Sequence, residues 1–521
     1  MKKAAGKILA PGGQPWDDAS VTRVLRCTAF ALAAAVMAVS AGTASQQLTV
    51  TIPEFWSEEL LHDYELPLAT PESTPKHVSR DYYYALPERV LYKSYPIYHP
   101  SREPAGYLDK LAALEPVPTF DPSTLKTEAE WIAAGRDVFE MPIDYEDAVV
   151  SMRMVRDPAW YERHRVPLAA DGTMPFARYV IRRKGLVEVG NLSCAMCHTR
   201  VLPGGLVVTG AQGNFPLDAS AREVLPSDVG MRVLIQLLTA APWDQALTER
   251  TDALTIAQLR QVITPPGVSV RQGTSVFAPA AIPDLIGLRD RRYLDRTGLG
   301  RHRGPADLMR YAALNQGMDL LSNYGGLVPI ANDMKTLPPP GGTIFAATNF
   351  RYSNAQLYAL SQFIYSLTPP SNPNPFDDRA KRGEAVFTAS GCARCHTPPL
   401  YTANKLVAAD GFTPPADHLK KYDIHDERVG TDPTLTMSTR RGTGYYKIPS
   451  LKGVWYRGPF EHNGSVATLE DWLDPARLKD DYVPTGWVGV GVKTRAVKGH
   501  PFGLGLSGDD RAALIAFLKT L

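Results

Sequence analysis

The chain has 521 residues, of which 44% are hydrophobic, with 56 Lys and Arg against 54 Asp and Glu. This length allows roughly two to four domains, and the composition is ordinary for a globular protein. The balanced charge gives no reason to expect nucleic acid or an anionic membrane surface as a partner.

The first 44 residues have the features of a secretory signal peptide. Five basic residues precede an apolar run at about positions 28–39, which ends in the small residues Ser40 to Ala44. The run is shorter than the roughly 20 residues that a membrane-spanning helix needs, so we expect no integral membrane span in the mature chain. Cleavage would also remove Cys27, the one cysteine outside the motifs described below, and no structural disulfide is expected.

Residues 45–127 are rich in proline and aromatic residues, such as the run Tyr82–Tyr84, but show neither helical nor strand periodicity. So many aromatic residues are not typical of disorder, and the missing pattern is not typical of a domain. We therefore predict an extended N-terminal arm that wraps the domains after it.

Two C-x-x-C-H motifs follow, and they consist of Cys194, Cys197 and His198 and of Cys392, Cys395 and His396. In this pattern two thiols form thioethers with the vinyl groups of one haem, and the adjacent His is held where it ligates iron. A zinc knuckle or a redox dithiol does not need a His directly after the second Cys. We predict two covalently attached c-type haems. Because bacteria attach such haems outside the cytoplasm, we expect the protein in the periplasm or secreted.

The sequence around the two motifs repeats. The matching pairs are Gly135–Phe139 with Gly383–Phe387, Ile282–Leu288 with Ile448–Val454, and the amphipathic segments 353–367 and 507–521. The first copy is larger, with about fifty extra residues between Phe139 and Cys194 and about thirty between His198 and Ile282. A helix, a C-x-x-C-H motif and a closing helix, in this order, are typical of a cytochrome c domain.

The predicted fold is mainly α, with two cytochrome c-type domains in tandem, of which the first is elaborated and rich in loops. The predicted parts are a signal peptide at 1–44, the arm at 45–127, the first domain at 128–370, a linker at 371–378 and the second domain at 379–521. The stretch Thr368–Pro375 at the start of the linker contains four prolines among polar residues, which predicts a stiff connection.

The second copy resembles the C-terminal domain of bacterial di-haem cytochrome c peroxidases, in Lys447–Leu451 and in Pro459–Glu470. The resemblance covers residues 130–521 and includes the methylamine-utilisation di-haem enzymes. Around the first motif, the lead-in Asn191–Ser193 and the large inserts are most similar to the rubber oxygenase branch. In the peroxidases a Met completes the second haem, but the corresponding residue here is Ala476. Related peroxidases have a Ca²⁺ ion between the haem domains, and the sequence does not decide whether this chain binds one.

For the second haem, His500 is the predicted sixth ligand, because it lies in a Gly-bounded loop just before the closing helix. A His takes this role in the branch that resembles the rubber oxygenases. Met437 is the alternative, and His418 and His425 are further candidates. We predict that His462 donates a hydrogen bond near this haem, unless it is a plain turn residue.

For the first haem, no His or Met occurs at positions 199–216, where the peroxidases carry a distal His. We therefore expect an iron that is open on its distal side. The repeat places Arg289–Tyr311 near it, with His302 as a candidate acid–base group and Tyr311 as a candidate catalytic residue. The Arg residues of this segment either stabilise bound oxygen species, hold haem propionates or form a solvated face. Arg200 is predicted to pair with a propionate.

We call a haem open if its iron has no protein ligand on the distal side, and closed if a sixth ligand occupies that side. An open haem beside a closed one predicts an exported oxidoreductase. In the preferred reading, the open haem activates O₂ for oxidation or oxygenation of a small or hydrophobic organic substrate, and the closed haem handles electrons. The first alternative is a di-haem peroxidase that reduces H₂O₂, and a small electron-carrier protein is a partner in either case. The second alternative is an electron-transfer cytochrome without enzymatic activity, in which His164 would have to reach the first haem.

Overall fold

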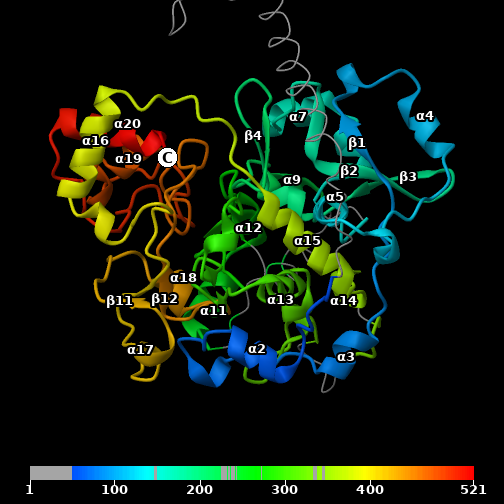
Figure 1. Ribbon diagram of the computed structural model, residues 1–521, viewed down its shortest axis with the longest axis horizontal. Coiled ribbons are helices and arrows are strands. Elements are labelled where there is room, and N and C mark those ends of the chain that lie inside the picture. The colour runs from blue at the N-terminus through cyan, green and yellow to red at the C-terminus, as the bar shows by residue number, and fades with distance from the viewer. Residues whose placement is uncertain are drawn as a thin grey trace, which may run out of the picture. The chain divides into compact units, whose positions relative to one another are not determined.

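Two pairs of crossing helices mark the two copies of the sequence repeat in the computed structural model. Helix α5 (Glu128–Glu140) packs across α15 (Asn354–Ser366), and α16 (Asp378–Ala389) packs across α20 (Gly508–Lys519). Figure 1 shows α16 and α20 side by side, away from α5 and α15. We call the chain from α5 to α15 the first repeat and the chain from α16 to α20 the second repeat.

Both crossings depend on a glycine. A Cβ added to Gly135 would lie 1.9 Å from the carbonyl oxygen of Ala359, and a Cβ added to Gly383 would lie 1.9 Å from that of Ala513. Only glycine lets the backbones of two helices approach this closely. The two positions that the sequence predicted to match therefore have the same contact in the structure.

The four helices begin at residues that cap them. Thr127 and Ser353 form capping boxes at the starts of α5 and α15, and the side chains of Asp377 and Ser507 cap α16 and α20. In each case a side-chain oxygen accepts a hydrogen bond from a backbone N–H of the first turn, which has no partner within the helix.

The structure describes residues 50–521 except 146–148, 225–231, 233–234, 236–240, 242, 271–272, 332–336 and 343–345. The predicted signal peptide lies outside these residues. Thr51–Leu521 form one unit by their contacts, and the domain boundaries that we predicted within it remain predictions. In the described part of the chain, no helix has both the length and the apolar character needed to cross a bilayer.

The N-terminal arm is more regular than the sequence predicted. It contains the helices α2 (Glu58–Tyr64), α3 (Arg80–Ala85) and α4 (Tyr107–Ala112) and the strand β1 (Ser94–Tyr98). These elements are too short to produce a recognisable period, and β1 is held by pairing with a distant strand, β2 (Thr173–Arg183). Phe55, Trp56 and Tyr83 of the arm are fully buried in the same hydrophobic cluster as α5 and α15. The arm thus completes the core of the first repeat.

The two inserts of the first repeat form local structure around the first motif. The insert before it contains α6 (Met152–Val155), α7 (Pro158–His164), β2 (Thr173–Arg183) and β3 (Leu186–Gly190). The strands form an antiparallel sheet in the order β1-β2-β3. The insert after it contains β4 (Thr199–Val201), β5 (Val207–Thr209), α9 (Leu217–Val224), α11 (Gln245–Asp252) and α12 (Ile256–Gln261).

The remaining elements are short, apart from α13. In the first repeat they are α8 (Cys194–Cys197), β6 (Val268–Ser269), β7 (Ala280–Ala281), β8 (Tyr293–Leu294), β9 (Gly300–Arg301), α13 (Pro305–Asn315) and α14 (Ala346–Asn349). In the second they are β10 (Leu406–Ala408), α17 (His418–Lys421), β11 (Ile424–His425), α18 (Thr434–Met437), β12 (Tyr445–Lys447) and α19 (Leu469–Trp472). The described part of the fold is thus mainly helical, with small sheets of two or three strands.

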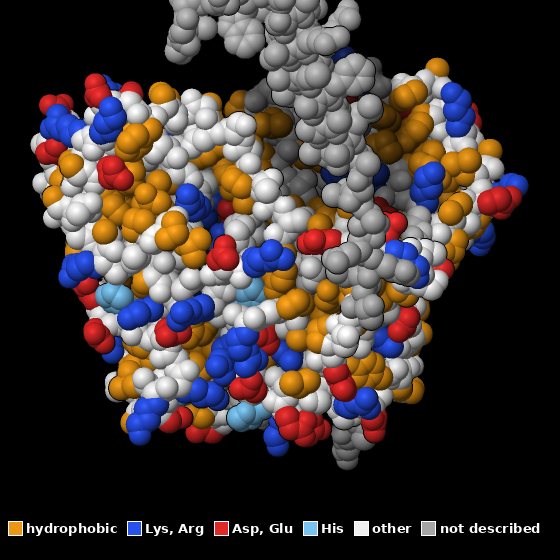
Figure 2. Space-filling view, viewed as in Figure 1, with side chains coloured by type: hydrophobic (Ala, Val, Ile, Leu, Met, Phe, Trp, Pro, Cys, Tyr) orange, Lys and Arg blue, Asp and Glu red, His pale blue; other side chains and the backbone are white. Residues whose placement is uncertain are grey.

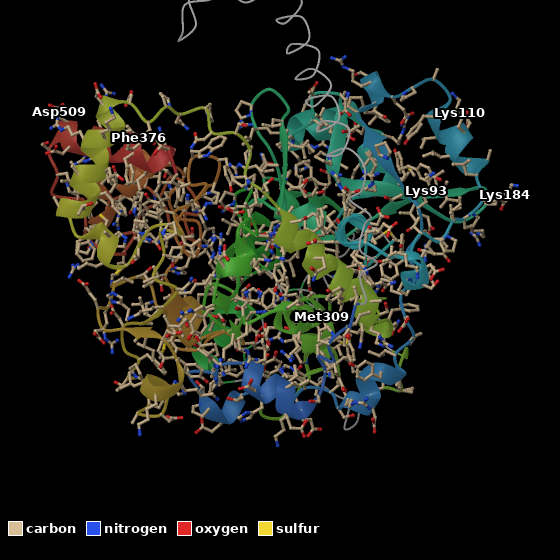
Figure 3. The ribbon with its side chains drawn as sticks, viewed as in Figure 1. Lys93, Lys110, Lys184, Met309, Phe376 and Asp509 are labelled. Carbon is tan, nitrogen blue, oxygen red and sulfur yellow. The ribbon has the colours of Figure 1, made fainter. Side chains whose placement is uncertain are left out.

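Helix α13 lies inside the molecule. Its Met309 is fully buried, and Figure 3 shows this residue among closely packed side chains, whereas Lys93, Lys110 and Lys184 lie at the outer edge. On the face shown in Figure 2, basic, acidic and hydrophobic side chains are mixed, in agreement with the balanced charge of the sequence.

Candidate haem sites

The first C-x-x-C-H motif is one helical turn, α8, followed by His198. The turn begins at Ser193, whose side chain accepts a hydrogen bond of 3.2 Å from the Met196 N–H. The Nδ1 of His198 lies 3.0 Å from the carbonyl oxygen of Pro283. A carbonyl can only accept, so this nitrogen carries the proton and Nε2 is the nitrogen suited to bind iron.

The second motif has a similar geometry. A 3₁₀ turn, Cys392–Arg394, leads to Cys395 and His396, whose Nδ1 lies 3.2 Å from the carbonyl oxygen of Tyr401. The carbonyl of Pro449, the repeat counterpart of Pro283, also interacts with this ring. Burial, followed by the charge of the nearby His500, lowers the pKa of His396 to about 4. Each motif therefore presents two thiols and an imidazole whose Nδ1 donates to a backbone carbonyl, which fits a c-type haem.

His500 lies in the loop before α20, close enough to His396 to lower its pKa. Its ring packs edge-on against Trp472, with 5.4 Å between the ring centres, and its Nδ1 is buried without a hydrogen-bond partner. Burial lowers the pKa of His500 as well. A buried neutral imidazole near a second one fits the axial pair of a closed haem.

Two buried residues surround His500. Arg477 is fully buried and donates to the carbonyl oxygens of Val497 and His500, both at 2.8 Å. Glu461 is the other neighbour, because a Cβ added to Gly499 would lie 2.5 Å from its Oε1. These contacts hold the loop that carries His500 against the second repeat.

The backbone identifies the equivalent positions of the first repeat. Asp295 and Glu461 both have left-handed backbone conformations, with φ of 66° and 71°. The same sequence spacing separates Gly287 from Gly453 and Gly298 from Gly464, and these four glycines also have positive φ values. In this register, Tyr311 occupies the place of Arg477. We conclude that Asp295 and Tyr311 correspond to the pair beside His500.

Tyr311 is part of a buried hydrogen-bonded network. Its hydroxyl donates to Asp295 at 2.8 Å, and Arg441 of the second repeat lies 3.3 Å from the same carboxylate and 3.5 Å from Asp319. The side chains of Asp295, Asp319 and Arg441 are almost completely buried. Sequence analysis named Tyr311 but missed Asp295 and Arg441. The register of the repeat could have indicated Asp295, whereas Arg441 meets it only through folding.

The end of α13 lies beside the first motif. The amide nitrogen of Gln316 is 3.9 Å from the Sγ of Cys194, and the amide oxygen is buried without a hydrogen-bond partner. Burial raises the pKa of Cys194 to about 12. Helix α13 thus connects the network of Tyr311, Asp295 and Arg441, which we call the distal network, to Gln316 beside this motif.

At the position that matches His500, the first repeat has Ala346. Ala346 precedes the N-cap Ser353 of α15 by the same spacing as His500 precedes the N-cap Ser507 of α20. The sequence from 337 to 352 contains no His, Met, Cys or Lys. A side chain with a strong ligand atom is therefore missing from the segment that supplies His500 in the second repeat.

His302 links two segments of the first repeat. Its Nδ1 lies 2.6 Å from the carbonyl oxygen of Arg291, and its Nε2 lies 2.6 Å from the hydroxyl of Tyr365 on α15. Burial lowers its pKa, so the ring is neutral. Both nitrogens are engaged by the protein, and the geometry does not support the acid–base role that we considered for this residue.

The other predicted residues are engaged in contacts between segments. Arg200 donates to the carbonyl oxygens of Gln212, at 3.2 Å, and Gly458, at 2.9 Å, and its pairing with a propionate stays a prediction. The Nδ1 of His462 lies 3.1 Å from Thr431 Oγ1, and its ring packs against Tyr446.

The other three histidines that we considered as ligands, His164, His418 and His425, also have protein partners. His164 contacts the Glu223 carboxylate at 2.5 Å, and His418 contacts the Tyr445 hydroxyl at 3.0 Å. His425 lies 3.4 Å from the Sγ of Cys395 and forms a group with Cys395 and Glu427. Thioether formation at Cys395 would remove the thiolate that a metal ion needs in this group.

Comparisons with known proteins agree with the motifs. Residues 444–482 match the family model described as "RoxA-like, cytochrome c-like". Cytochrome-c peroxidase IdrP1 of Denitromonas iodatirespirans is 28% identical over 165 residues, which are 27% of this chain and 40% of that protein. Methylamine utilization protein MauG of Methylorubrum extorquens is 26% identical over 153 residues, which are 27% of this chain and 34% of that protein.

Among solved structures, a MauG-like protein associated with microbial copper homeostasis is 17% identical, with a TM-score of 0.26. The match covers 56% of this chain and 87% of that one. The chain matches at most 40% of the length of the curated relatives given above.

Proposed function

Because this chain belongs to the superfamily of di-haem cytochrome c peroxidases and MauG, with a RoxA-like cytochrome c segment, we propose that it is an exported di-haem oxidoreductase. Cys194, Cys197 and His198 hold a haem with an open distal side, and Cys392, Cys395 and His396 hold a haem that His500 closes. The open site uses O₂ to oxidise or oxygenate an organic substrate. The signal-like N-terminus and the thioether motifs support export to the periplasm or beyond.

The proposal rests on the difference between the two distal sides. In the second repeat, a buried imidazole lies near His396, and Arg477 donates to the loop that carries it. In the first repeat, the equivalent position is Ala346, and the place of Arg477 is taken by Tyr311. A closed haem transfers electrons, whereas an open one provides a site for O₂ or peroxide.

The chain's own residues give the open site a defined environment. The Tyr311 hydroxyl donates a hydrogen bond to Asp295, and Arg441 holds that carboxylate in place through an ion pair. Cys194 packs against a large hydrophobic cluster, which includes Leu314 and Met318 and excludes water from this side of the motif. The site thus combines one proton donor with an apolar wall, a combination that suits a hydrophobic substrate.

Reduction of H₂O₂ is the second candidate function. It is favoured by the similarity to proteins that are named cytochrome-c peroxidases. The missing His at positions 199–216 argues for the oxygenase reading, because the peroxidases that this chain resembles carry an acid–base His there. A pure electron carrier would need a ligand on the first haem, but His164 is bonded to Glu223 instead.

Optical and magnetic spectra of the purified holoprotein test the open and closed sites. We expect one haem to bind CO after reduction and the other to remain low-spin with two His ligands. In the variant His500→Ala, both haems should bind CO. The control is Tyr365→Phe, which removes a hydroxyl far from His500 in sequence, and in this variant only one haem should bind CO. Wild-type protein in which neither haem binds CO would disprove both enzymatic readings.

Turnover distinguishes the two enzymatic readings. Oxygen uptake with cleavage of an unsaturated hydrocarbon would support the oxygenase. Rapid consumption of H₂O₂ with a reduced cytochrome c as electron donor, and no oxygen uptake, would instead establish the peroxidase.

A further inference from the structure

A narrow pocket lies between the peptide segments that position the two proximal histidines. It is lined by Pro283 and Pro449, whose carbonyls interact with the rings of His198 and His396. The lining thus comes from both repeats and adjoins both motifs. The charged side chains that line this pocket are mostly basic. The basic ones are Arg291, Arg296, Lys405, Lys447 and Arg457.

Backbone carbonyls hold the basic groups in place. Arg296 donates to the carbonyl oxygens of Ala281 and Ile282, at 2.8 and 3.2 Å. Lys447 donates to that of Tyr293 at 3.4 Å.

The two other guanidinium groups are held in the same way. Arg291 donates to the carbonyls of Asp284 and Ile286, and Arg457 donates to that of Ser450. Carbonyl groups orient a cation but do not neutralise its charge.

The pocket lacks enough acidic groups to balance these cations. Among its lining residues, Asp284 is the one carboxylate, 3.9 Å from Arg457, and it also accepts a hydrogen bond from Tyr456. The nearby Asp295 is already bonded to Tyr311 and Arg441. Burial and the adjacent guanidinium groups lower the pKa of Lys447 to about 7. The cations of this pocket therefore repel one another.

Buried cations of this kind need anions, because burial of unpaired charge is costly. The two haems of the proposed function carry four propionate carboxylates, and Arg binds carboxylates through paired N–H groups. We propose that this pocket is a carboxylate site that receives propionates of both haems, so that Lys447 and the three largely buried arginines Arg291, Arg296 and Arg457 take the place of a Ca²⁺ ion between the repeats. This inference rests on the presence of the two haems.

The proposal predicts a change in reduction potential. A positive charge near a haem favours its reduced state, so Lys447→Gln should lower the midpoint potential of both haems in the holoprotein. Arg296→Gln should act in the same direction. Arg292→Gln is the matched control, because this residue adjoins Arg291 in sequence but is exposed and paired with Asp423. It should leave both potentials unchanged.

Titration with CaCl₂, followed by calorimetry and by the optical spectrum, tests the same site without a variant. We expect no stoichiometric Ca²⁺ binding and no effect of a chelator on the spectrum. Stoichiometric Ca²⁺ binding that shifts the potentials would overturn the proposal, and so would unchanged potentials in Lys447→Gln. A shift of the wild-type potentials with added inorganic phosphate would show that a free anion occupies the pocket, which also contradicts the proposal.

The number of covalent haems, measured on the same samples, separates this inference from the proposed function. Two haems per chain with unchanged potentials would contradict the carboxylate site alone. Fewer than two haems per chain in the wild-type protein would contradict the proposed function as well.

Discussion

The two repeats share their framework and differ on the distal side of the haem that each motif would hold. In both, a glycine permits a close helix crossing, and a proline carbonyl orients the proximal His. In the second repeat, Glu461 and Arg477 hold the His500 loop, whereas their counterparts Asp295 and Tyr311 form a network with Arg441. In the proposed function, these few differences at equivalent places separate a closed site from an open one.

The repeats also differ in what covers them. Two inserts and the N-terminal arm surround the first repeat, and the arm contributes Trp56 and Tyr83 to its core. The second repeat has a smaller hydrophobic cluster of its own, around Phe387 and Phe517. The elaborated cover lies where we place the reactive site, as expected if the cover shapes access for a substrate.

The largest expected effect comes from the thioether cysteines. Replacing Cys194 and Cys197 by Ser should remove one covalent haem and abolish catalysis, and replacing Cys392 and Cys395 should remove the other haem. Mass spectrometry and haem staining after denaturing electrophoresis measure the loss. Cys27→Ser is the control and should retain both haems. Loss of both haems from either pair of substitutions would show that the repeats do not bind haem independently.

The helix crossings should be equally sensitive in both repeats. Gly135→Ala and Gly383→Ala each place a methyl group against a backbone carbonyl, and we expect each to destabilise the fold by about 3 kcal/mol or more. Gly508→Ala, at the start of α20, meets nothing within 4 Å and should not destabilise it. Denaturant unfolding of the holoprotein gives the free energies. A small effect at one crossing alone would mean that the repeats are not packed alike.

The distal network should matter in the first repeat alone. Tyr311→Phe removes the hydroxyl that donates to Asp295, and we expect turnover to fall about 100-fold, as when a proton donor is lost. The spectrum of the second haem should stay unchanged. Tyr365→Phe, which loses a hydrogen bond to His302 instead, should retain turnover within about threefold. Equal losses in the two variants would indicate a structural role for Tyr311.

The smallest expected effect concerns the arm. Burial lowers the pKa of His77, but the Glu65 carboxylate, 2.7 Å away, more than compensates, so its pKa is raised. Such a group stabilises the fold below its unfolded pKa of about 6.5, and this stabilisation is lost as the pH rises through the folded pKa. His77→Gln should therefore cost roughly 2 kcal/mol at pH 6 and less at pH 9. A cost independent of pH would contradict the ion pair.

Local signals in the sequence were sufficient for the parts of the fold that depend on neighbouring residues. The C-x-x-C-H spacing, the paired glycines and the closing helices are short patterns, and the structure has the same helix crossing twice. The arm was predicted incorrectly as extended, because its helices span six or seven residues and its strand depends on pairing with β2. His302 was considered for catalysis because residue type alone does not reveal that both ring nitrogens are bonded.

By itself, the sequence determined that two C-x-x-C-H motifs lie in two unequal copies of one unit, since these motifs and the helix packing follow from residue type and spacing. The tertiary structure decided which side chains meet across those copies. Arg441 reaches Asp295, and Lys447 joins Arg296 beside both proximal segments, although each pair is more than 140 residues apart in the chain. Charge and burial act through space, so these contacts, and the chemistry that we assign to them, exist only after folding.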